Sequence, residues 1–359
     1  MKSLKIKSLI LAMCYLTTPL LGYLSPQEEK IYLEKFSPPQ ELRLGIDLFL
    51  SNTTARDFFV NRTRHQYLPK LGVRRFTAGD RLRWSIDQKN LKNNWESKYV
   101  PMYEALCSEG NITPLADLNK NSFILASDIY WPKHVLKMSK SEWFDFEEDG
   151  QSKLVRYKNI SRVFYNDKLH EFIKKYNARF LYAVQKYLYH IPGMPTELSD
   201  RNYAIVAEKI DNLPSSRMSK QSFGAMLDYQ KLEIKPEFQP MIRELVQATF
   251  YTGIADLRPH NIFLIEKEGI NKIVIIDTER HGYFDTDKNF FHKSAQEVHE
   301  SALRGLFNFA FYTLELPEKS AYVVVKHLQS LLPPVVEEKK SKISKETARL
   351  KKKKFQRKK

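Results

Sequence analysis

Residues 253–279 hold the side chains of this 359-residue chain whose types and spacing are best suited to chemistry. The segment reads GIADLRPHNIFLIEKEGINKIVIIDTE, with Asp256 and Asn261 before two apolar runs and Asp277 after them. A carboxylate and an amide oxygen held close together on stiff strands can bind Mg²⁺, which prefers oxygen ligands and often shares them with phosphates. We therefore predict a metal site at Asn261 and Asp277, with Asp256 as a separate carboxylate that points into the same cleft.

The two apolar runs must position these groups, and the turn between them contains Gly269. Two short β-prone runs around such a turn predict an antiparallel hairpin. If Ile262 pairs with Ile276, Asn261 falls opposite Asp277 at the open end of the hairpin, where paired Cα atoms lie about 4.5–5.5 Å apart. The polar residues also have purely structural interpretations, as a turn cap, a turn residue or the end of a strand.

The rest of the chain divides by pattern into strand-rich and helix-rich parts. Residues 25–110 carry apolar positions at helical spacing, which predicts a helical N-terminal extension. Residues 111–214 contain short strand candidates and one amphipathic helix at 160–176, whereas residues 215–338 are mainly helical. This order predicts an α+β protein with a strand-rich small lobe and a helical large lobe.

Two segments and one glycine mark boundaries within this layout. The polar stretch 139–153 predicts an exposed loop or the tip of a hairpin, and the turn-rich stretch 211–224 predicts a connection between the lobes. Apolar residues repeat at intervals of three and four from 238 to 249, and Gly253 stands where such a helix should end.

The basic charge of the chain is concentrated at its ends. The chain has 58 Lys and Arg against 42 Asp and Glu, a net charge of +16, but residues 339–359 hold twelve basic residues and one acidic residue. We expect this segment to be a disordered tail, and binding to nucleic acid or an anionic membrane is expected only through it. The body is nearly neutral, and its 42% hydrophobic content excludes a disordered chain.

The N-terminus has the pattern of a signal peptide. Residues 1–24 place three lysines before an apolar run, and Gly22 is a small residue near its end. We therefore expect an exported or secreted protein; if the run is instead the first helix of the fold, a cytoplasmic location is expected. The two cysteines, Cys14 and Cys107, would leave one thiol after cleavage and no internal disulfide.

The stretch 253–279 resembles the catalytic core of the protein-kinase-like superfamily. In that family the loop H-R-D-L-K-P-x-N is followed by a hairpin and an Asp-Phe-Gly motif. Here I-A-D-L-R-P-H-N matches the loop, so the resemblance implies that Asp256 is the catalytic base and Asn261 a metal ligand. Asp277 in I-I-D-T-E matches the metal-binding aspartate, and Arg258 replaces the lysine that contacts the transferring phosphate.

Upstream segments extend the resemblance to about residues 121–332. Lys137 in H-V-L-K-M resembles the lysine that contacts nucleotide phosphates, with a strand-edge lysine as the alternative. The segment YAIVAEKID resembles the hinge, which implies that the backbone near Ala207 and Lys209 meets the adenine of ATP. Glu171 is the candidate acid that pairs with Lys137.

The helix that carries Glu171 gives that assignment an alternative. On a helical wheel Glu171 lies about 140° from the centre of the apolar stripe, so a solvated side chain is an equal interpretation. Arg162 and Asn166 face nearer the core side than Glu171 does.

The sequence also departs from the family pattern. Ile254 and Ala255 replace the His-Arg pair, and Glu279 replaces the glycine of the metal motif. The segment before Lys137 contains no glycine-rich loop, and no Ala-Pro-Glu motif follows Asp277. The large lobe is therefore expected to be abbreviated.

The resemblance implies an ATP- and Mg²⁺-dependent phosphotransferase that acts on a hydroxyl group of a protein or a small molecule. The departures leave a second interpretation, a catalytically weak pseudokinase that serves as a nucleotide-binding or scaffold module. A third interpretation is a nucleic-acid or membrane-surface binder that acts through the basic tail.

Overall fold

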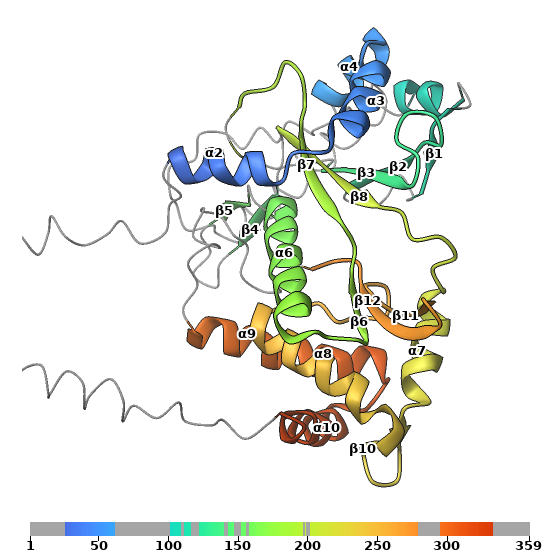
Figure 1. Cartoon of the computed structure of the whole chain (residues 1–359), viewed down its shortest axis with the longest axis vertical. Helices are drawn as coiled ribbons and strands as arrows, with labels where there is room; N and C mark the ends of the chain where they lie inside the picture. Colours follow the sequence, from blue (N-terminus) through green and yellow to red (C-terminus); the bar gives the residue numbers. More distant parts are fainter. Residues whose placement is uncertain are drawn as a thin grey trace, which may run out of the picture.

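The computed structural model describes residues 26–61, 101–108, 111–115, 122–139, 143–146, 152–155, 158–196, 198, 202–278 and 295–332. The expected leader, the basic tail and Glu279 lie outside these ranges. The described chain is a mixed α+β structure, as predicted, with mainly antiparallel sheets. In Figure 1 the largest sheet lies at the top, helices from the second half of the chain lie at the bottom, and helix α6 (Lys158–Tyr176) lies between them.

The largest sheet has five strands in the order β1-β2-β3-β8-β7, and every neighbouring pair is antiparallel. The strands are β1 (Thr113–Pro114), β2 (Ser122–Ala126), β3 (His134–Ser139), β7 (Lys186–His190) and β8 (Tyr203–Glu208). The strands predicted from the sequence in these regions are confirmed. Because side chains alternate along a strand, Leu136 and Met138 are buried on one face of β3, and half-buried Lys137 lies on the other.

Helices from the N-terminal region pack on this sheet. They are α2 (Pro26–Lys35), α3 (Gln40–Leu50), α4 (Thr53–Asn61) and the helical residues 101–108. Ile46, Phe49 and Phe58 from this region share one hydrophobic cluster with Trp131 and Leu136 of the sheet region. The core of the sheet is thus completed by side chains from the helical region that precedes it.

The long helix α6 (Lys158–Tyr176) connects the sheet to the rest of the fold and confirms the helix predicted at 160–176. Tyr165, Leu169 and Phe172 are buried on its apolar side, whereas Tyr176 is exposed. The polar stretch before α6 contains the paired strands β4 (Trp143–Phe146) and β5 (Ser152–Val155), which agrees with the predicted hairpin.

The second half of the chain is mainly helical. Its helices are α7 (Ser216–Gly224), the short 3₁₀ helix η1 (Pro236–Phe238), α8 (Gln239–Thr252), α9 (Ala295–Asn308), the π-helical turn η3 (Phe309–Thr313) and α10 (Glu318–Ser330). Two short strands, β9 (Leu227–Asp228) and β10 (Glu233–Ile234), pair with each other. Gly253 ends α8 with a φ of 73°, as predicted for a left-handed helix terminus.

One segment differs from the sequence prediction. Residues 211–224 were expected to be a turn-rich connection, but their second half forms α7. Ser215 caps this helix, because its side chain accepts a hydrogen bond from the backbone N–H of Met218. The buried face of α7 is anchored by Phe223 and by Ser219, whose hydroxyl donates to the carbonyl of Ile262 at 2.6 Å.

The hairpin after α8 consists of β11 (Ile262–Lys267) and β12 (Ile270–Ile275), and β12 also pairs in parallel with β6 (Leu181–Ala183). The predicted register was wrong by one residue, because Ile262 pairs with Ile275 and not with Ile276. The cause is a tight turn: Glu268 and Gly269 both have positive φ, of 59° and 70°, as a two-residue hairpin turn requires. Such a turn fixes which residues face each other.

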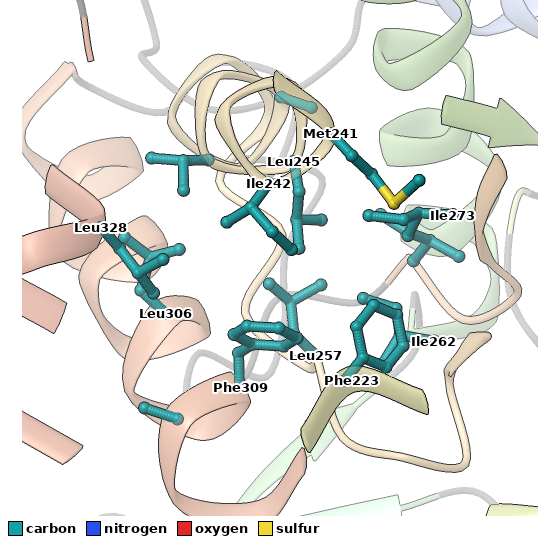
Figure 2. Packing of buried hydrophobic residues seen from close by; sticks show 14 of the residues in the cluster. Phe223, Met241, Ile242, Leu245, Leu257, Ile262, Ile273, Leu306, Phe309 and Leu328 are labelled. Carbon is teal, nitrogen blue, oxygen red and sulfur yellow. The ribbon is translucent and has the colours of Figure 1, made fainter. Parts of the chain in front are cut away.

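The core of the second half is shown in Figure 2. Side chains from α7, α8, α9, α10 and the hairpin meet there, including Phe223, Ile242, Ile262, Leu306 and Leu328. Leu257, which follows α8, lies in the same core close to Phe309. Within the described ranges, the helices are too short or too polar to cross a lipid bilayer.

Candidate functional site

Two residues of the predicted site, far apart in the sequence, meet on one face of the five-stranded sheet. Lys137 extends from β3, and Asp277 follows β12 after Ile276. The ammonium group of Lys137 donates a hydrogen bond to Oδ2 of Asp277 over 3.4 Å. Both side chains are largely buried, so the contact lies inside the protein and not on its surface.

Two further cations reach the same place from other elements. Nε of Arg162, on α6, lies 2.7 Å from Oδ1 of Asp277. Lys186, on β7, is buried and donates to the hydroxyl of Thr278 at 3.1 Å. Thr278 in turn donates to the backbone carbonyl of Arg162 at 2.5 Å, which ties α6, β7 and the end of the hairpin together. We call Lys137, Arg162, Lys186 and Asp277 the basic cluster.

The charge of Asp277 is set by these neighbours. Burial favours the neutral acid, but Arg162, Lys137 and Lys186 outweigh burial and hold the pKa of Asp277 well below its ordinary value. Asp277 is therefore ionised at neutral pH. Its Oδ1 atom is nevertheless buried and accepts no hydrogen bond from the described residues, although Nε of Arg162 lies 2.7 Å from it.

The loop after α8, residues 253–258, carries the predicted catalytic residues. Asp256 is buried, and its Oδ1 lies 3.3 Å from Nε of Arg258. The guanidinium of Arg258 also stacks on the ring of Tyr312 at 4.8 Å. Asn261 donates through Nδ2 to the backbone carbonyl of Asp256 at 3.3 Å. The structure thus brings Asp256, Arg258 and Asn261 together in one short segment.

A backbone hydrogen bond connects this loop with the basic cluster. The N–H of Ile276 donates to the carbonyl of Asn261 at 2.9 Å, in line with the corrected hairpin register. Asp277 is therefore the residue directly after the partner of Asn261, and not its partner. Both predicted metal ligands still lie at the same end of the hairpin.

The 253–258 loop is held from below by α9 and the π-helical turn. Three buried side chains donate to three of its carbonyls: Ser301 to Gly253 at 2.6 Å, Asn308 to Ala255 at 2.8 Å and Thr313 to Leu257 at 2.8 Å. We call these three contacts the loop ladder. Gly305 permits the close approach, because a Cβ atom there would lie 2.4 Å from the carbonyl oxygen of Ile254.

The donor set suits a metal ion that arrives with phosphates. The described residues contain no group of three or more His, Cys, Asp or Glu side chains that could hold a metal. The candidate site offers the buried Oδ1 of Asp277, which has no aligned donor, and the amide oxygen of Asn261. Two oxygen ligands fit Mg²⁺ whose other ligands are phosphate oxygens and water.

The other predicted residues lie outside these contacts. Glu171, the expected partner of Lys137, pairs with Lys168 on its own helix at 2.8 Å and is substantially exposed. The reason is the one the helical wheel indicated, since Glu171 faces away from the apolar stripe. The carboxylate that Lys137 contacts is that of Asp277.

The predicted adenine-binding segment is engaged in the sheet. Ala207 lies in β8 between Val135 of β3 and Lys186 of β7. The N–H of Lys209 donates to the carbonyl of Lys133 at 2.8 Å, and its side chain lies 3.8 Å from Asp128. A base that binds here must therefore use backbone groups other than the N–H of Lys209.

Sequence reasoning did not assign roles to Arg162, Lys186 or the residues of the loop ladder. A signal existed for Arg162, because the helical wheel places it nearer the core than Glu171. For Lys186 the signal is weaker: it lies two residues before Leu188 on β7, so the two side chains point to the same face, and both are buried. Comparisons of the sequence with models of protein families and with curated proteins find no match.

Proposed function

We propose that the protein is an ATP- and Mg²⁺-dependent phosphotransferase of the protein-kinase-like superfamily, with a small lobe around the five-stranded sheet and a helical large lobe. The observation that carries the proposal is the contact between Lys137 and Asp277, which are 140 residues apart. Kinases require a strand lysine and a metal-binding aspartate at one phosphate site. If the residues of D-L-R-P-H-N served only as turn caps and strand ends, Lys137 and Asp277 would not need to be in contact.

The chemistry follows from the positions of the residues. Lys137 would orient the phosphates of ATP, and Asp277 and Asn261 would hold the metal ion against them. Bound Mg²⁺ would neutralise charge on the β- and γ-phosphates. Asp256 would steer or accept the proton of the acceptor hydroxyl, whose oxygen takes the γ-phosphoryl group while ADP leaves. Arg258, held 3.3 Å from Asp256, would offset charge on the moving group.

One observation favours the second candidate, a catalytically weak pseudokinase. Both acidic residues of the site face arginines: Asp277 faces Arg162 at 2.7 Å, and Asp256 faces Arg258 at 3.3 Å. An aspartate paired with an arginine is a weaker proton acceptor, since the pairing favours its ionised form. Such a protein would bind nucleotide without efficient transfer.

Titration calorimetry of the full chain with Mg·ATP, and with ATP plus a chelator, tests the proposal together with an ATP turnover assay. Asp277→Asn should remove the metal-dependent part of nucleotide binding and abolish turnover. Glu300→Gln, an acid-to-amide change at an exposed position of α9, is the matched control. Unchanged Mg·ATP behaviour in Asp277→Asn rejects both candidates, whereas metal-dependent binding without turnover in the natural chain selects the pseudokinase.

A further inference from the structure

We propose that Lys137, Arg162 and Lys186 form a polyphosphate-binding site around Asp277, and that this site holds the phosphate chain of the nucleotide through side chains. The inference rests on the proposed function, because it names the groups that would grip the phosphates of the same ligand. It goes further by assigning Arg162 and Lys186, which lie outside the kinase-like sequence motifs.

The first support is the convergence of three cations from three separate elements. Lys137 comes from β3, Arg162 from α6 and Lys186 from β7, and all three act on Asp277. Lys186 and the side chain of Arg162 are more than nine-tenths buried. Cations that converge on one place from separate elements raise the local positive potential, and a phosphate chain is an anion that such a potential attracts.

The second support is that the cations are fixed in position. Thr278 accepts a hydrogen bond from Lys186 and donates one to the backbone of Arg162, so one hydroxyl holds both elements at the site. Arginine binds phosphate through several donors in a planar fork, and lysine binds it as a point charge. A rigid set of both kinds loses little side-chain entropy when the anion binds.

The third support is the position of Asp277 between two of the cations. Its Oδ1 lies 2.7 Å from Nε of Arg162, and its Oδ2 lies 3.4 Å from Nζ of Lys137. Phosphates that share a metal ion with Asp277 would lie next to both cations. The sequence has no glycine-rich loop before Lys137, the feature whose backbone amides usually bind the phosphates. Side chains would supply that function here.

The arrangement also predicts the order of binding. Arg162 faces one oxygen of Asp277 and Lys137 faces the other, so a metal ion alone meets two competing cations. A phosphate chain draws these cations towards itself and brings its own ligands for the metal. Polyphosphate should therefore bind without Mg²⁺, and Mg²⁺ should bind appreciably only when polyphosphate is present.

Calorimetric titration of the full chain with inorganic tripolyphosphate in the presence of a chelator tests the site. Arg162→Gln and Lys186→Gln should each weaken binding about tenfold or more, because each removes charge-assisted hydrogen bonds to the anion. Lys168→Gln removes the same charge from α6 at a residue paired with Glu171, and it should leave the affinity within about twofold. ATP should compete with tripolyphosphate in the chelator, and adenosine should not.

Because Arg162 and Lys186 are buried, thermal unfolding without ligand must show that each variant is folded. Lys137→Gln, at a more accessible position of the cluster, provides a second test if either variant unfolds. Tripolyphosphate affinity that is equal in the natural chain and in the folded cluster variants overturns the site, as does an absence of tripolyphosphate binding to the natural chain.

The two proposals fail in different ways. A chain that binds tripolyphosphate through the cluster but neither binds Mg·ATP in a metal-dependent manner nor transfers phosphate keeps the site and loses the proposed function. A chain that turns over Mg·ATP while Arg162→Gln and Lys186→Gln bind tripolyphosphate normally keeps the function and loses the site.

Discussion

The side-chain amide of Asn308 donates a hydrogen bond to the carbonyl oxygen of Ala255, 2.8 Å away, directly beside the candidate catalytic residue Asp256. Ser301 and Thr313 make equivalent contacts two residues to either side along the loop. All three donors are buried, so the carbonyls they satisfy have no simple replacement from water. The loop ladder therefore fixes the backbone on either side of Asp256, and all three of its donor side chains come from outside the loop.

Breaking the ladder should impair transfer more than nucleotide binding. Asn308→Ala leaves the carbonyl of Ala255 without its donor, which should cost about 1–3 kcal/mol in stability and let Asp256 move. Because the basic cluster stays intact, we expect the kcat of ATP turnover to fall about tenfold or more with little change in KM. Thr313→Val, which keeps the shape and removes the hydroxyl, should act in the same direction.

Gln296→Ala, at an exposed position near the start of α9, is the control for changes to this helix. Steady-state kinetics and urea unfolding measure the two effects separately. If Asn308→Ala and Thr313→Val lower stability but leave kcat unchanged, the ladder supports the fold and does not position Asp256.

The candidate site shows which features a sequence can predict. Local patterns were sufficient for α8, because apolar spacing indicates its buried side and Gly253 marks its end. The hairpin was also predicted, but its register was not. Gly269 indicated a turn, but the register also depends on the positive φ of Glu268. A positive φ is uncommon for glutamate, so the residue type does not predict it.

Contacts between segments far apart in the sequence could not be predicted from local sequence patterns. The pair of Arg162 and Asp277 joins a helix to the end of a hairpin 115 residues later, and no periodicity relates the two. The ladder residues Ser301, Asn308 and Thr313 have side chains that are common on exposed helix faces. Their burial becomes evident only when α9 is placed beneath the 253–258 loop.

The docking of α3 onto the sheet region gives a test in which two effects have opposite signs. Gly45 lies within α3, and a Cβ atom there would come within 1.8 Å of the carbonyl oxygen of Tyr130. Alanine in place of glycine normally stabilises a helix by about 1 kcal/mol. Here the contact is with backbone, so α3 must shift, and we expect Gly45→Ala to destabilise the protein by about 1–3 kcal/mol or more.

Leu44→Ala changes the neighbouring, exposed residue and should alter the free energy of unfolding by less than about 0.5 kcal/mol. Urea unfolding of the full chain measures both variants. A stabilising effect of Gly45→Ala would mean that α3 does not pack against the 128–130 turn. In that case the helical region would be an appendage of the sheet and not part of its core.

The protonation of His170 predicts how stability depends on pH. Burial lowers the pKa of His170 below its ordinary value of 6.5, and the charge of Lys186 acts in the same direction. The carbonyl of Val184 and the carboxylates of Asp167 and Glu208 oppose this shift without cancelling it. The folded protein therefore binds a proton at His170 less readily than the unfolded chain does.

Stability from this source is complete above pH 6.5 and is lost as the pH falls from 6.5 through the lower pKa of the folded state. His170→Gln removes the titrating group, so the decrease in melting temperature between pH 7.5 and pH 5.5 should be smaller in this variant than in the natural chain. His299→Gln, the same substitution at an exposed histidine of α9, is the matched control. If the melting temperature of the His170 variant depends on pH as that of the natural chain does, burial does not lower the pKa of His170.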